Sequence, residues 1–243
     1  GTCHARRRIF DEIWRSGLSI EGDHMTIVKI CGLKDPENAV VAADAGADLI
    51  GVVFVEGVRR NVSLPQAEQI VSAFSTKTKI RMPKSVGLFA DQSLEFVNMA
   101  VEKCQLDYVQ LCGEETLDYC TQVEAQVIRQ YKVNESYSIQ RDKERIIRDL
   151  DQISEAGCMP LLDRFEHGSL GGTGKTFDWT LIDGISDQID FMLAGGLTSD
   201  NVGFAIKSVS PWGVDVSTGV ETDQVKDATK IIEFIDVARS ILD

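Results

Sequence analysis

The chain has 243 residues, of which 43% are hydrophobic and 26% are charged. This composition is that of a globular domain and not of a disordered, collagen-like or membrane chain. Lys and Arg number 25 against 38 Asp and Glu, for a formal net charge of −13, which argues against nucleic acid or an anionic membrane as the main partner. With no long apolar run and no secretory signal, we expect a cytoplasmic protein. A small phosphorylated ligand is compatible with the negative net charge, since backbone N–H groups can bind a phosphate whatever that charge is.

The cysteines and histidines do not form a metal-binding pattern. None of the six cysteines pairs with another as C-x-x-C, and none of the three histidines stands at a ligand spacing from a cysteine. We therefore expect no metal and no disulfide framework. In a reducing compartment the thiols are expected to pack in the core.

Residues 1–24 differ from the rest of the chain. A basic stretch at Arg6–Arg8 precedes Ile9, Phe10, Ile13 and Trp14, which are spaced like one apolar face of a short helix. Two interpretations stay open: a poorly ordered extension, or a helix that caps the domain or contacts a partner. A regular pattern begins at Met25, so residues 25–243 are predicted to form a single domain.

From Met25 onward, short β-branched apolar runs alternate with segments of helical period. The predicted strands are Thr26–Cys31, Asp48–Phe54, Ser85–Ala90, Asp107–Leu111, Gln126–Lys132, Cys158–Asp163, Phe191–Gly195 and Trp212–Ser217. The predicted helices are Pro36–Ala45, Pro65–Phe74, Leu94–Cys104, Thr116–Glu124, Lys143–Ala156, Phe177–Ile185, Asn201–Val209 and Gln224–Leu242. Strands that alternate with helices are expected to pair in parallel with one another. Eight strand–helix units in about 220 residues favour a (β/α)₈ TIM barrel, which is an α/β fold.

Two glycine-bearing turns follow the seventh and eighth predicted strands. Gly195-Gly196 follows one, and Ser217-Thr218-Gly219 follows the other. Glycine lets the backbone approach an anion closely, and the loops after these two strands bind phosphate in many barrels. We predict a phosphate site formed by both turns together.

The segment Gly171–Thr176 ends in Gly-Lys-Thr and so resembles a nucleotide-binding P-loop. That motif requires a glycine five residues before Gly174, where this chain has Ser169. We therefore reject an ATPase.

Cys31 and Asp163 end the first and sixth predicted strands, where barrel active sites lie. Lys29 shares a strand face with Cys31, and we hypothesise that its charge lowers the pKa of the thiol. The apolar residues before Asp163 are expected to keep its carboxyl partly protonated, as an acid requires. Taken singly, Cys31 is better explained as a buried thiol at a strand end and Asp163 as a helix cap than as catalytic groups. Arg59-Arg60 follow the second strand and are either a surface pair or carboxylate ligands.

These motifs together resemble the phosphoribosylanthranilate isomerase family. The similarity runs in order from about Met25 to Asp243, and residues 1–24 lie outside it. The matching motifs are Val28-Lys29-Ile30-Cys31-Gly32, Gly51–Phe54 with Arg59–Ser63, Val109–Gly113, Leu161-Leu162-Asp163, Gly171–Trp179, Leu193–Leu197 and Gly213–Glu221.

The resemblance implies a cofactor-free Amadori rearrangement of N-(5-phosphoribosyl)anthranilate in tryptophan biosynthesis. By motif, Asp163 would be the general acid and Cys31 the general base. Arg60 would bind the anthranilate carboxylate, and Asp215 would help to orient the aminobenzoate. The phosphate would lie on the backbone of Gly195, Gly196, Ser217 and Thr218. The sequence is compatible with a monomer or a homodimer.

The chain departs from the family pattern at two places. The usual Gln-Leu-His-Gly reads Gln110-Leu111-Cys112-Gly113. After Glu221 the family commonly has Pro-Gly before Lys-Asp, whereas here Thr222-Asp223-Gln224-Val225 precedes Lys226-Asp227. Two alternatives stay open. Indole-glycerol-phosphate synthase is disfavoured because its chemistry relies on a lysine and glutamates at strand ends, and Lys29 is the only good lysine here. A non-catalytic binding module is disfavoured by the presence of Cys31 and Asp163.

Overall fold

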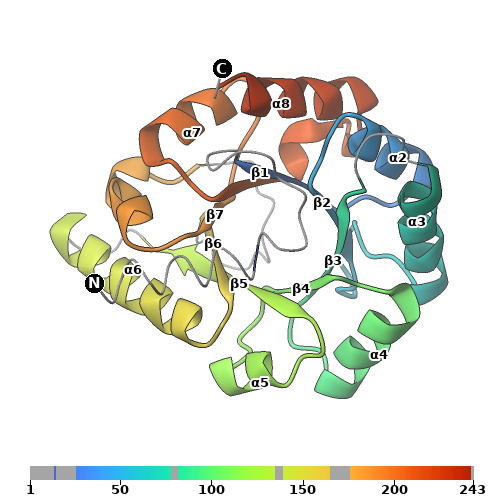
Figure 1. Ribbon diagram of the computed structural model, residues 1–243, viewed down its shortest axis with the longest axis horizontal. Coiled ribbons are helices and arrows are strands. Elements are labelled where there is room, and N and C mark those ends of the chain that lie inside the picture. Colours follow the sequence, from blue (N-terminus) through green and yellow to red (C-terminus); the bar gives the residue numbers. More distant parts are fainter. Residues whose placement is uncertain (1–13, 15–25, 78–81, 135–138, 165–175, 242–243) are drawn as a thin grey trace.

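Eight parallel strands close into a barrel in which each strand pairs with the next and β8 pairs with β1. The computed structural model describes residue 14 and residues 26–77, 82–134, 139–164 and 176–241. The strands are β1 (Ile27–Cys31), β2 (Leu49–Val53), β3 (Lys84–Phe89), β4 (Tyr108–Leu111), β5 (Gln126–Val133), β6 (Met159–Arg164), β7 (Met192–Leu193) and β8 (Gly213–Val216). Figure 1 shows the helices as a ring around them. The predicted (β/α)₈ barrel is confirmed.

The strands form where the sequence is apolar on both faces, because one face meets the barrel interior and the other meets the helices. β1 and β2 are buried along their whole length. In the β1–β8 pair, Lys29 is in register with Asp215. The pairing therefore places two charged residues at the same height in adjacent strands.

The helices begin at residues that can cap them. Asp35, Ser93, Thr116 and Asp227 each accept a hydrogen bond from an amide of the following first turn. The helices are α2 (Pro36–Asp44), α3 (Leu64–Lys77), α4 (Leu94–Cys104), α5 (Leu117–Thr121), α6 (Ile139–Glu155), α7 (Val202–Val209) and α8 (Ala228–Ser240).

Two predicted helices are wrong in part. In place of a helix over Phe177–Ile185 there are two short 3₁₀ helices, η1 (Trp179–Ile182) and η2 (Ile185–Asp187). Asp183 is extended and Gly184 has a φ of 70°, which ends the first helical segment and turns the chain. The crossover between β6 and β7 is therefore not an α-helix in its described part.

The last helix begins four residues later than predicted. A third 3₁₀ helix, η3 (Thr218–Val220), follows β8, and a small hairpin of β9 (Glu221–Thr222) and β10 (Val225–Lys226) comes before α8. Asp223 and Gln224 have φ values of 50° and 66°, the geometry of a two-residue hairpin turn. Periodicity missed the hairpin because its strands are only two residues long.

Arg239 of α8 ties the end of the barrel to its beginning. Its guanidinium donates to the carbonyls of Thr26 at 2.7 Å and Gly46 at 3.0 Å, and lies 2.5 Å from the carboxylate of Asp48. Asp48 in turn accepts from the amide of Val28 at 2.8 Å. The last helix is thereby fixed to the first strand.

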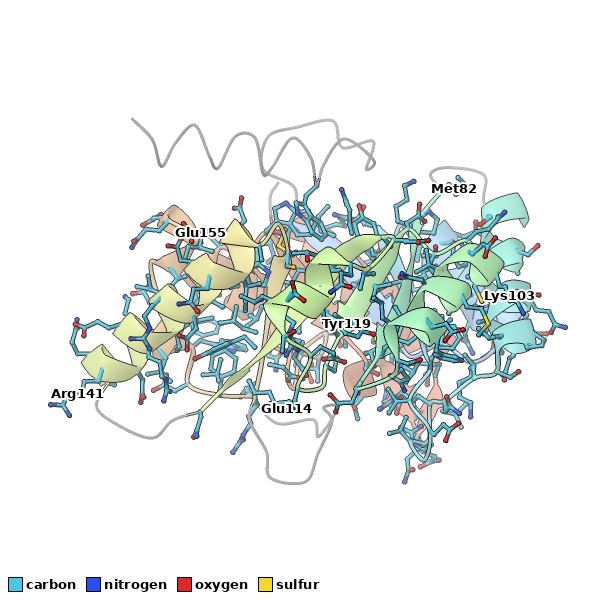
Figure 2. The ribbon with its side chains drawn as sticks, turned by 90° about the horizontal axis from the view of Figure 1, so that it is seen from below. Met82, Lys103, Glu114, Tyr119, Arg141 and Glu155 are labelled. Atoms are coloured by element: carbon cyan, nitrogen blue, oxygen red, sulfur yellow. The ribbon has the colours of Figure 1, made fainter. Side chains whose placement is uncertain are left out.

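The two ends of the barrel differ in chemistry. In Figure 2, Met82 and Glu155, which precede β3 and β6, lie towards one end, and Glu114, which follows β4, lies towards the other. The amino ends of the strands enclose an apolar cluster that includes Trp14, Tyr108 and Trp212. In the described part of the chain, no helix has the length and apolarity needed to span a membrane.

Candidate active site

A pocket of about 350 Å³ opens at the carboxyl ends of the strands. Every residue predicted to act in the site lines it, namely Cys31, Arg60, Asp163, Gly195, Gly196, Asp215, Ser217 and Thr218. They come from the ends of β1, β6 and β8 and from the loops after β2, β7 and β8. The fold thus brings together residues that are up to 187 positions apart in the sequence.

Lys29 and Asp215 form a buried ion pair beneath the pocket. Lys29 Nζ lies 2.9 Å from Asp215 Oδ1, and the two side chains are 0% and 8% exposed. Burial acts to lower the pKa of Lys29, but the charges of Asp215 and Cys31 outweigh it and raise the pKa. The ammonium is therefore charged at neutral pH.

The pKa of the Cys31 thiol departs from its predicted direction. Burial is the largest influence and raises this pKa, and the charge of Lys29 only partly opposes it. The influence of Lys29 has the expected sign, but a net lowering of the thiol pKa is wrong, because a fully buried sulfur loses the hydration that favours a thiolate. Cys31 is protonated in the resting site.

Asp163 is a carboxyl with a raised pKa. Its burial in β6 raises the pKa to about 6, although hydrogen bonds from the Arg164 amide and the Gln130 side chain oppose the shift. These two donors lie 2.8 Å from Oδ1 and Oδ2 respectively. The expectation of a partly protonated Asp163 agrees with this environment, and a pKa near 6 suits proton transfer at neutral pH.

The two glycine turns are packed against each other and against Asp163. Gly195 has a φ of 88°, and a methyl group added to it would lie 2.7 Å from Asp163 Oδ1. A methyl group on Gly219 would lie only 1.9 Å from the carbonyl oxygen of Leu197, in the other turn. Asn201 closes the first turn by donating to the Gly196 carbonyl at 2.9 Å. Glycine is required at these two positions by close approach to other atoms of the chain, and the predicted phosphate contact stays a prediction.

Arg60 lies at the pocket wall and is held by Glu221. Its Nε donates to Oε1 of Glu221 at 2.8 Å, and its Nη2 donates to Thr218 Oγ1 at 2.9 Å. Arg59 also contacts Glu221, at 2.6 Å. Arg60 is therefore fixed within the chain and is not a solvated surface residue, and its binding of a substrate carboxylate stays a prediction.

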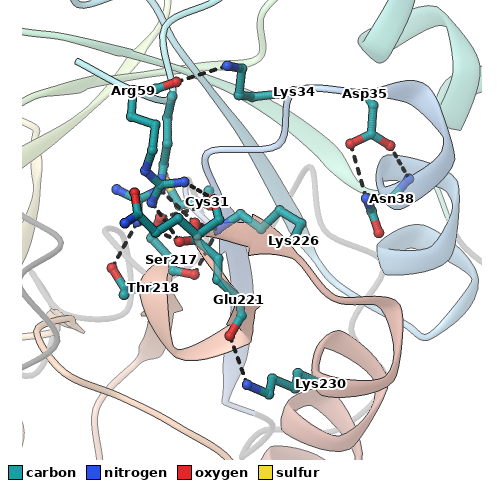
Figure 3. A network of polar contacts seen from close by, with 12 residues as sticks. Cys31, Lys34, Asp35, Asn38, Arg59, Ser217, Thr218, Glu221, Lys226 and Lys230 are labelled. Atoms are coloured by element: carbon teal, nitrogen blue, oxygen red, sulfur yellow. Dashed lines mark hydrogen bonds and ion pairs between the residues drawn. The ribbon is translucent and has the colours of Figure 1, made fainter.

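Glu221 connects Arg60 to the second glycine turn. Figure 3 shows Glu221 among Arg59, Lys226 and Ser217. Lys226 lies 3.0 Å from Glu221 Oε1 and donates to the Ser217 carbonyl at 2.7 Å. Burial acts to raise the pKa of Glu221, but hydrogen bonds from Arg60 and Arg59 and the charge of Lys226 lower it to about 2. One ionised carboxylate therefore fixes both Arg60 and the Ser217 turn.

Cys112 occupies the end of β4 at the pocket wall. It is buried and accepts a hydrogen bond from the Gln110 side chain, 3.3 Å from Nε2 to Sγ. Burial raises the pKa of its thiol to about 12. At neutral pH this group is a neutral thiol and not a proton carrier.

Three supporting residues were not predicted from the sequence. Gln130 orients Asp163, while Glu221 and Lys226 fix Arg60 and Ser217. Glu221 and Lys226 lie within motifs of the family pattern, which was the available signal. Gln130 lies inside a strand, and only its inward position in β5 gives it a role.

Some residues that the sequence analysis considered and did not assign to the site lie outside the described residues. This applies to Gly171–Lys175, the segment considered as a P-loop, and to His4, His24 and His167. In the described ranges, no group of three or more His, Cys, Asp and Glu side chains is arranged to hold a metal ion.

A carboxyl with a raised pKa, a thiol, an anchored arginine and two glycine turns lie together at the mouth of a (β/α)₈ barrel. This is the arrangement expected of a barrel enzyme that transfers protons on a phosphorylated substrate. Comparison with known proteins gives the particular family. The family model of N-(5'-phosphoribosyl)anthranilate (PRA) isomerase matches residues 28–237. The chain belongs to this family, and it is an isomerase.

Individual relatives and solved structures support the same family assignment. The N-(5'-phosphoribosyl)anthranilate isomerase of Desulforudis audaxviator is 40% identical over 220 residues, which cover 90% of this chain and all of the relative. A crystal structure of monomers of the dimeric enzyme from Thermotoga maritima has a TM-score of 0.73 at 32% identity, covering 89% of this chain and 100% of that one. An isomerase in complex with reduced 1-(o-carboxyphenylamino)-1-deoxyribulose 5-phosphate has a TM-score of 0.71 at 32% identity, with the same coverage.

Proposed function

We propose that Asp163 and Cys31 are the general acid and general base of this isomerase. The activity is the cofactor-independent rearrangement of N-(5'-phosphoribosyl)anthranilate to 1-(2-carboxyphenylamino)-1-deoxyribulose 5-phosphate, a step of tryptophan biosynthesis. The observation that carries the proposal is the meeting of both residues in one pocket, with Arg60 and the two glycine turns beside them. Positioned proton transfer contributes large rate factors without a cofactor.

The proposed reaction begins with opening of the furanose ring. Asp163 donates its proton to the ring oxygen, the bond from that oxygen to C1 breaks, and the nitrogen lone pair forms a Schiff base. Cys31 then takes the proton from C2, and the electron pair moves to give an enolamine. Tautomerisation of the enolamine yields the ketone, and the proton on Cys31 returns to Asp163 through product or solvent.

The resting protonation state differs from the reactive one. Burial raises the pKa of Cys31 and raises that of Asp163 to about 6, so the resting pair is a thiol and a carboxylate. The reactive pair, a thiolate and a carboxylic acid, holds the same number of protons. One proton shift from Cys31 to Asp163 therefore activates the site, and Lys29 favours this shift by lowering the cost of the thiolate.

The substrate's two anionic ends are proposed to bind to different groups of the pocket lining. Arg60, held in place by Glu221, would pair with the anthranilate carboxylate. The backbone around Gly195, Gly196, Ser217 and Thr218 would bind the phosphate, and the neighbouring Lys226 adds positive charge. Asp215, fixed by Lys29, would orient the aminobenzoate. These roles rest on the family resemblance and on the shared pocket.

We further propose that the enzyme works in the cytoplasm, as a monomer or a homodimer. The five cysteines in the described residues are free thiols, which suits a reducing compartment.

The test is turnover of phosphoribosylanthranilate, generated in situ and followed by anthranilate fluorescence. Asp163→Asn and Cys31→Ala should each lose about 10²–10⁴-fold in kcat, with thermal unfolding showing intact folds. Cys104→Ala, which removes a buried thiol outside the pocket, is the matched control and should keep parental turnover. Unchanged turnover in Cys31→Ala would reject the assigned base.

A further inference from the structure

The amino end of the barrel contains an aromatic cluster that the catalytic site does not use. Tyr108 is the first residue of β4, and Trp212 immediately precedes β8. Around them lie apolar side chains from the starts of other strands, among them Ile27, Leu49 and Met192. Cys31, Asp163 and the glycine turns lie towards the other ends of these strands, so this cluster is a separate feature of the barrel.

Trp14 fills the centre of this cluster. Its side chain is 1% exposed, although it comes from the segment before the first strand. Its ring stacks on Tyr108 with centroids 5.4 Å apart and planes inclined by 21°, and meets Trp212 edge to face at 6.2 Å and 81°. Both arrangements are favourable for aromatic pairs. A single indole ring is thus held by one stacked and one perpendicular neighbour.

The Trp14 ring and the side chains around it differ in whether the family match includes them. The family match begins at residue 28, and it includes Tyr108 and Trp212 but not Trp14. The chain covers all of its Desulforudis audaxviator relative with only 90% of its own length. Trp14 is therefore an addition to the family barrel, and its complete burial shows that the barrel end accommodates an indole.

We propose that the amino end of the barrel is an indole-binding socket, which Trp14 occupies as an intramolecular ligand that stabilises the barrel. The walls come from several strands that the barrel holds rigidly, so shortening Trp14 would leave a preformed apolar cavity. Such cavities stay dry and bind free aromatic molecules of matching shape. The ligand class of the emptied socket is accordingly a neutral bicyclic aromatic, with indole itself as the closest match.

The experiment compares the full chain with its Trp14→Ala variant. Loss of a buried Trp side chain should lower Tm by about 6–20 °C for a chain of this size. Indole should then raise the Tm of Trp14→Ala in a concentration-dependent way and leave the parent unaffected. The kcat/KM for phosphoribosylanthranilate should stay at the parental value, because the catalytic groups lie at the other end of the strands.

Two variants serve as controls. Trp14→Phe keeps a ring in the socket and should give an intermediate Tm and a weaker response to indole. Ile139→Ala removes a large apolar side chain that is 58% exposed, and should leave Tm and the indole response unchanged. A parental Tm in Trp14→Ala, or an equal indole shift in both proteins, would overturn the proposal.

A second measurement needs no change at Trp14. Of the three tryptophans, Trp14 and Trp212 are 1% and 5% exposed, whereas Trp179 is partly buried. In a Trp179→Phe variant, acrylamide should therefore quench little of the remaining fluorescence. Strong quenching of half of the signal would mean that Trp14 is outside the socket in solution, and would overturn the proposal even if Trp14→Ala fails to fold.

Discussion

Lys29 Nζ and Asp215 Oδ1 lie 2.9 Å apart and join β1 to β8 inside the barrel, below the catalytic pocket. Breaking such a pair leaves one charge buried without compensation, which costs about 3–5 kcal/mol. We predict that Lys29→Met lowers the free energy of unfolding by an amount of this order, measured by urea denaturation. It should also lower kcat, because the thiolate of Cys31 loses its nearby positive charge.

A double variant separates these two effects. Lys29→Met combined with Asp215→Leu removes both charges, so much of the lost stability should return, while turnover should stay low. Recovery of turnover together with stability would contradict an electrostatic role for Lys29.

The pH dependence of catalysis should reflect the resting protonation state. Between the pKa of Asp163, about 6, and that of Cys31, the pair holds one proton. Below about pH 6 the carboxylate also becomes protonated, the pair then holds two protons, and kcat/KM should fall as pH decreases. A profile of kcat/KM with its acid limb near pH 4 instead would show that burial does not raise the Asp163 pKa in solution.

Ionisation of Asp163 should also lower the free energy of unfolding as pH rises. Its folded pKa of about 6 lies above the ordinary value of 3.8, so ionisation favours the unfolded chain, and the cost develops between these two pH values. A shift of this size corresponds to about 3 kcal/mol. Asp163→Asn should therefore unfold at higher urea concentration than the parent above pH 6, with the difference shrinking below pH 4. An equal difference at both pH values would contradict this assignment.

Glu221 should act on substrate binding. Glu221→Gln weakens its contacts with Arg60 and with Lys226, which supports Ser217. We predict that KM rises roughly 10-fold, a loss equivalent to about one charge-assisted hydrogen bond, with a smaller change in kcat. Asp107→Asn, which weakens the Lys84–Asp107 pair near the amino ends of β3 and β4, is the matched control and should leave KM unchanged. A fall in kcat with constant KM would contradict the positioning role.

Gly195→Ala should affect catalysis more than backbone strain alone predicts. Its added methyl group would lie 2.7 Å from Asp163 Oδ1, so the acid must move. Gly157 has a similar φ of 80°, and a methyl group added there would meet no atom within 4 Å, so Gly157→Ala measures the strain alone. Both variants should lose about 1–2 kcal/mol of stability, and only Gly195→Ala should lose kcat. Equal kinetics in the two variants would show that the close approach has no catalytic consequence.

Cys112→His should be neutral or mildly favourable for turnover. The buried Cys112 thiol, with a pKa of about 12, transfers no proton at neutral pH, and the residue is assigned neither catalytic role. Steady-state kinetics of the variant would check this, and a large loss of kcat would show that the wall at the end of β4 is fitted to a thiol.

The sequence predicted the barrel because the strands are apolar on both faces, and this signal does not depend on distant contacts. It missed the η1 and η2 turns between β6 and β7, where Gly184 interrupts a segment of helical spacing. It also missed the β9–β10 hairpin, since two-residue strands have no readable period. Both errors lie in short segments whose conformation depends on single residues.

The candidate site residues were found from strand ends and from the family resemblance, and all of them meet in one pocket. The direction of the Cys31 pKa was wrong, because sequence spacing reveals the neighbouring Lys29 but not the extent of burial. The importance of Gln130 and the connection through Glu221 were likewise not predictable. They arise from contacts between residues 33 and 161 positions apart.

The separation of the aromatic socket from the catalytic pocket has a consequence for how the chain tolerates change. The buried carboxyl of Asp163 works against folding when it ionises, at one end of the strands. Stability supplied at the other end by Trp14 does not constrain the geometry of the reacting groups. A stabilising contact at the amino end therefore leaves the chain more room for substitutions at the mouth, such as Cys112→His, before it unfolds.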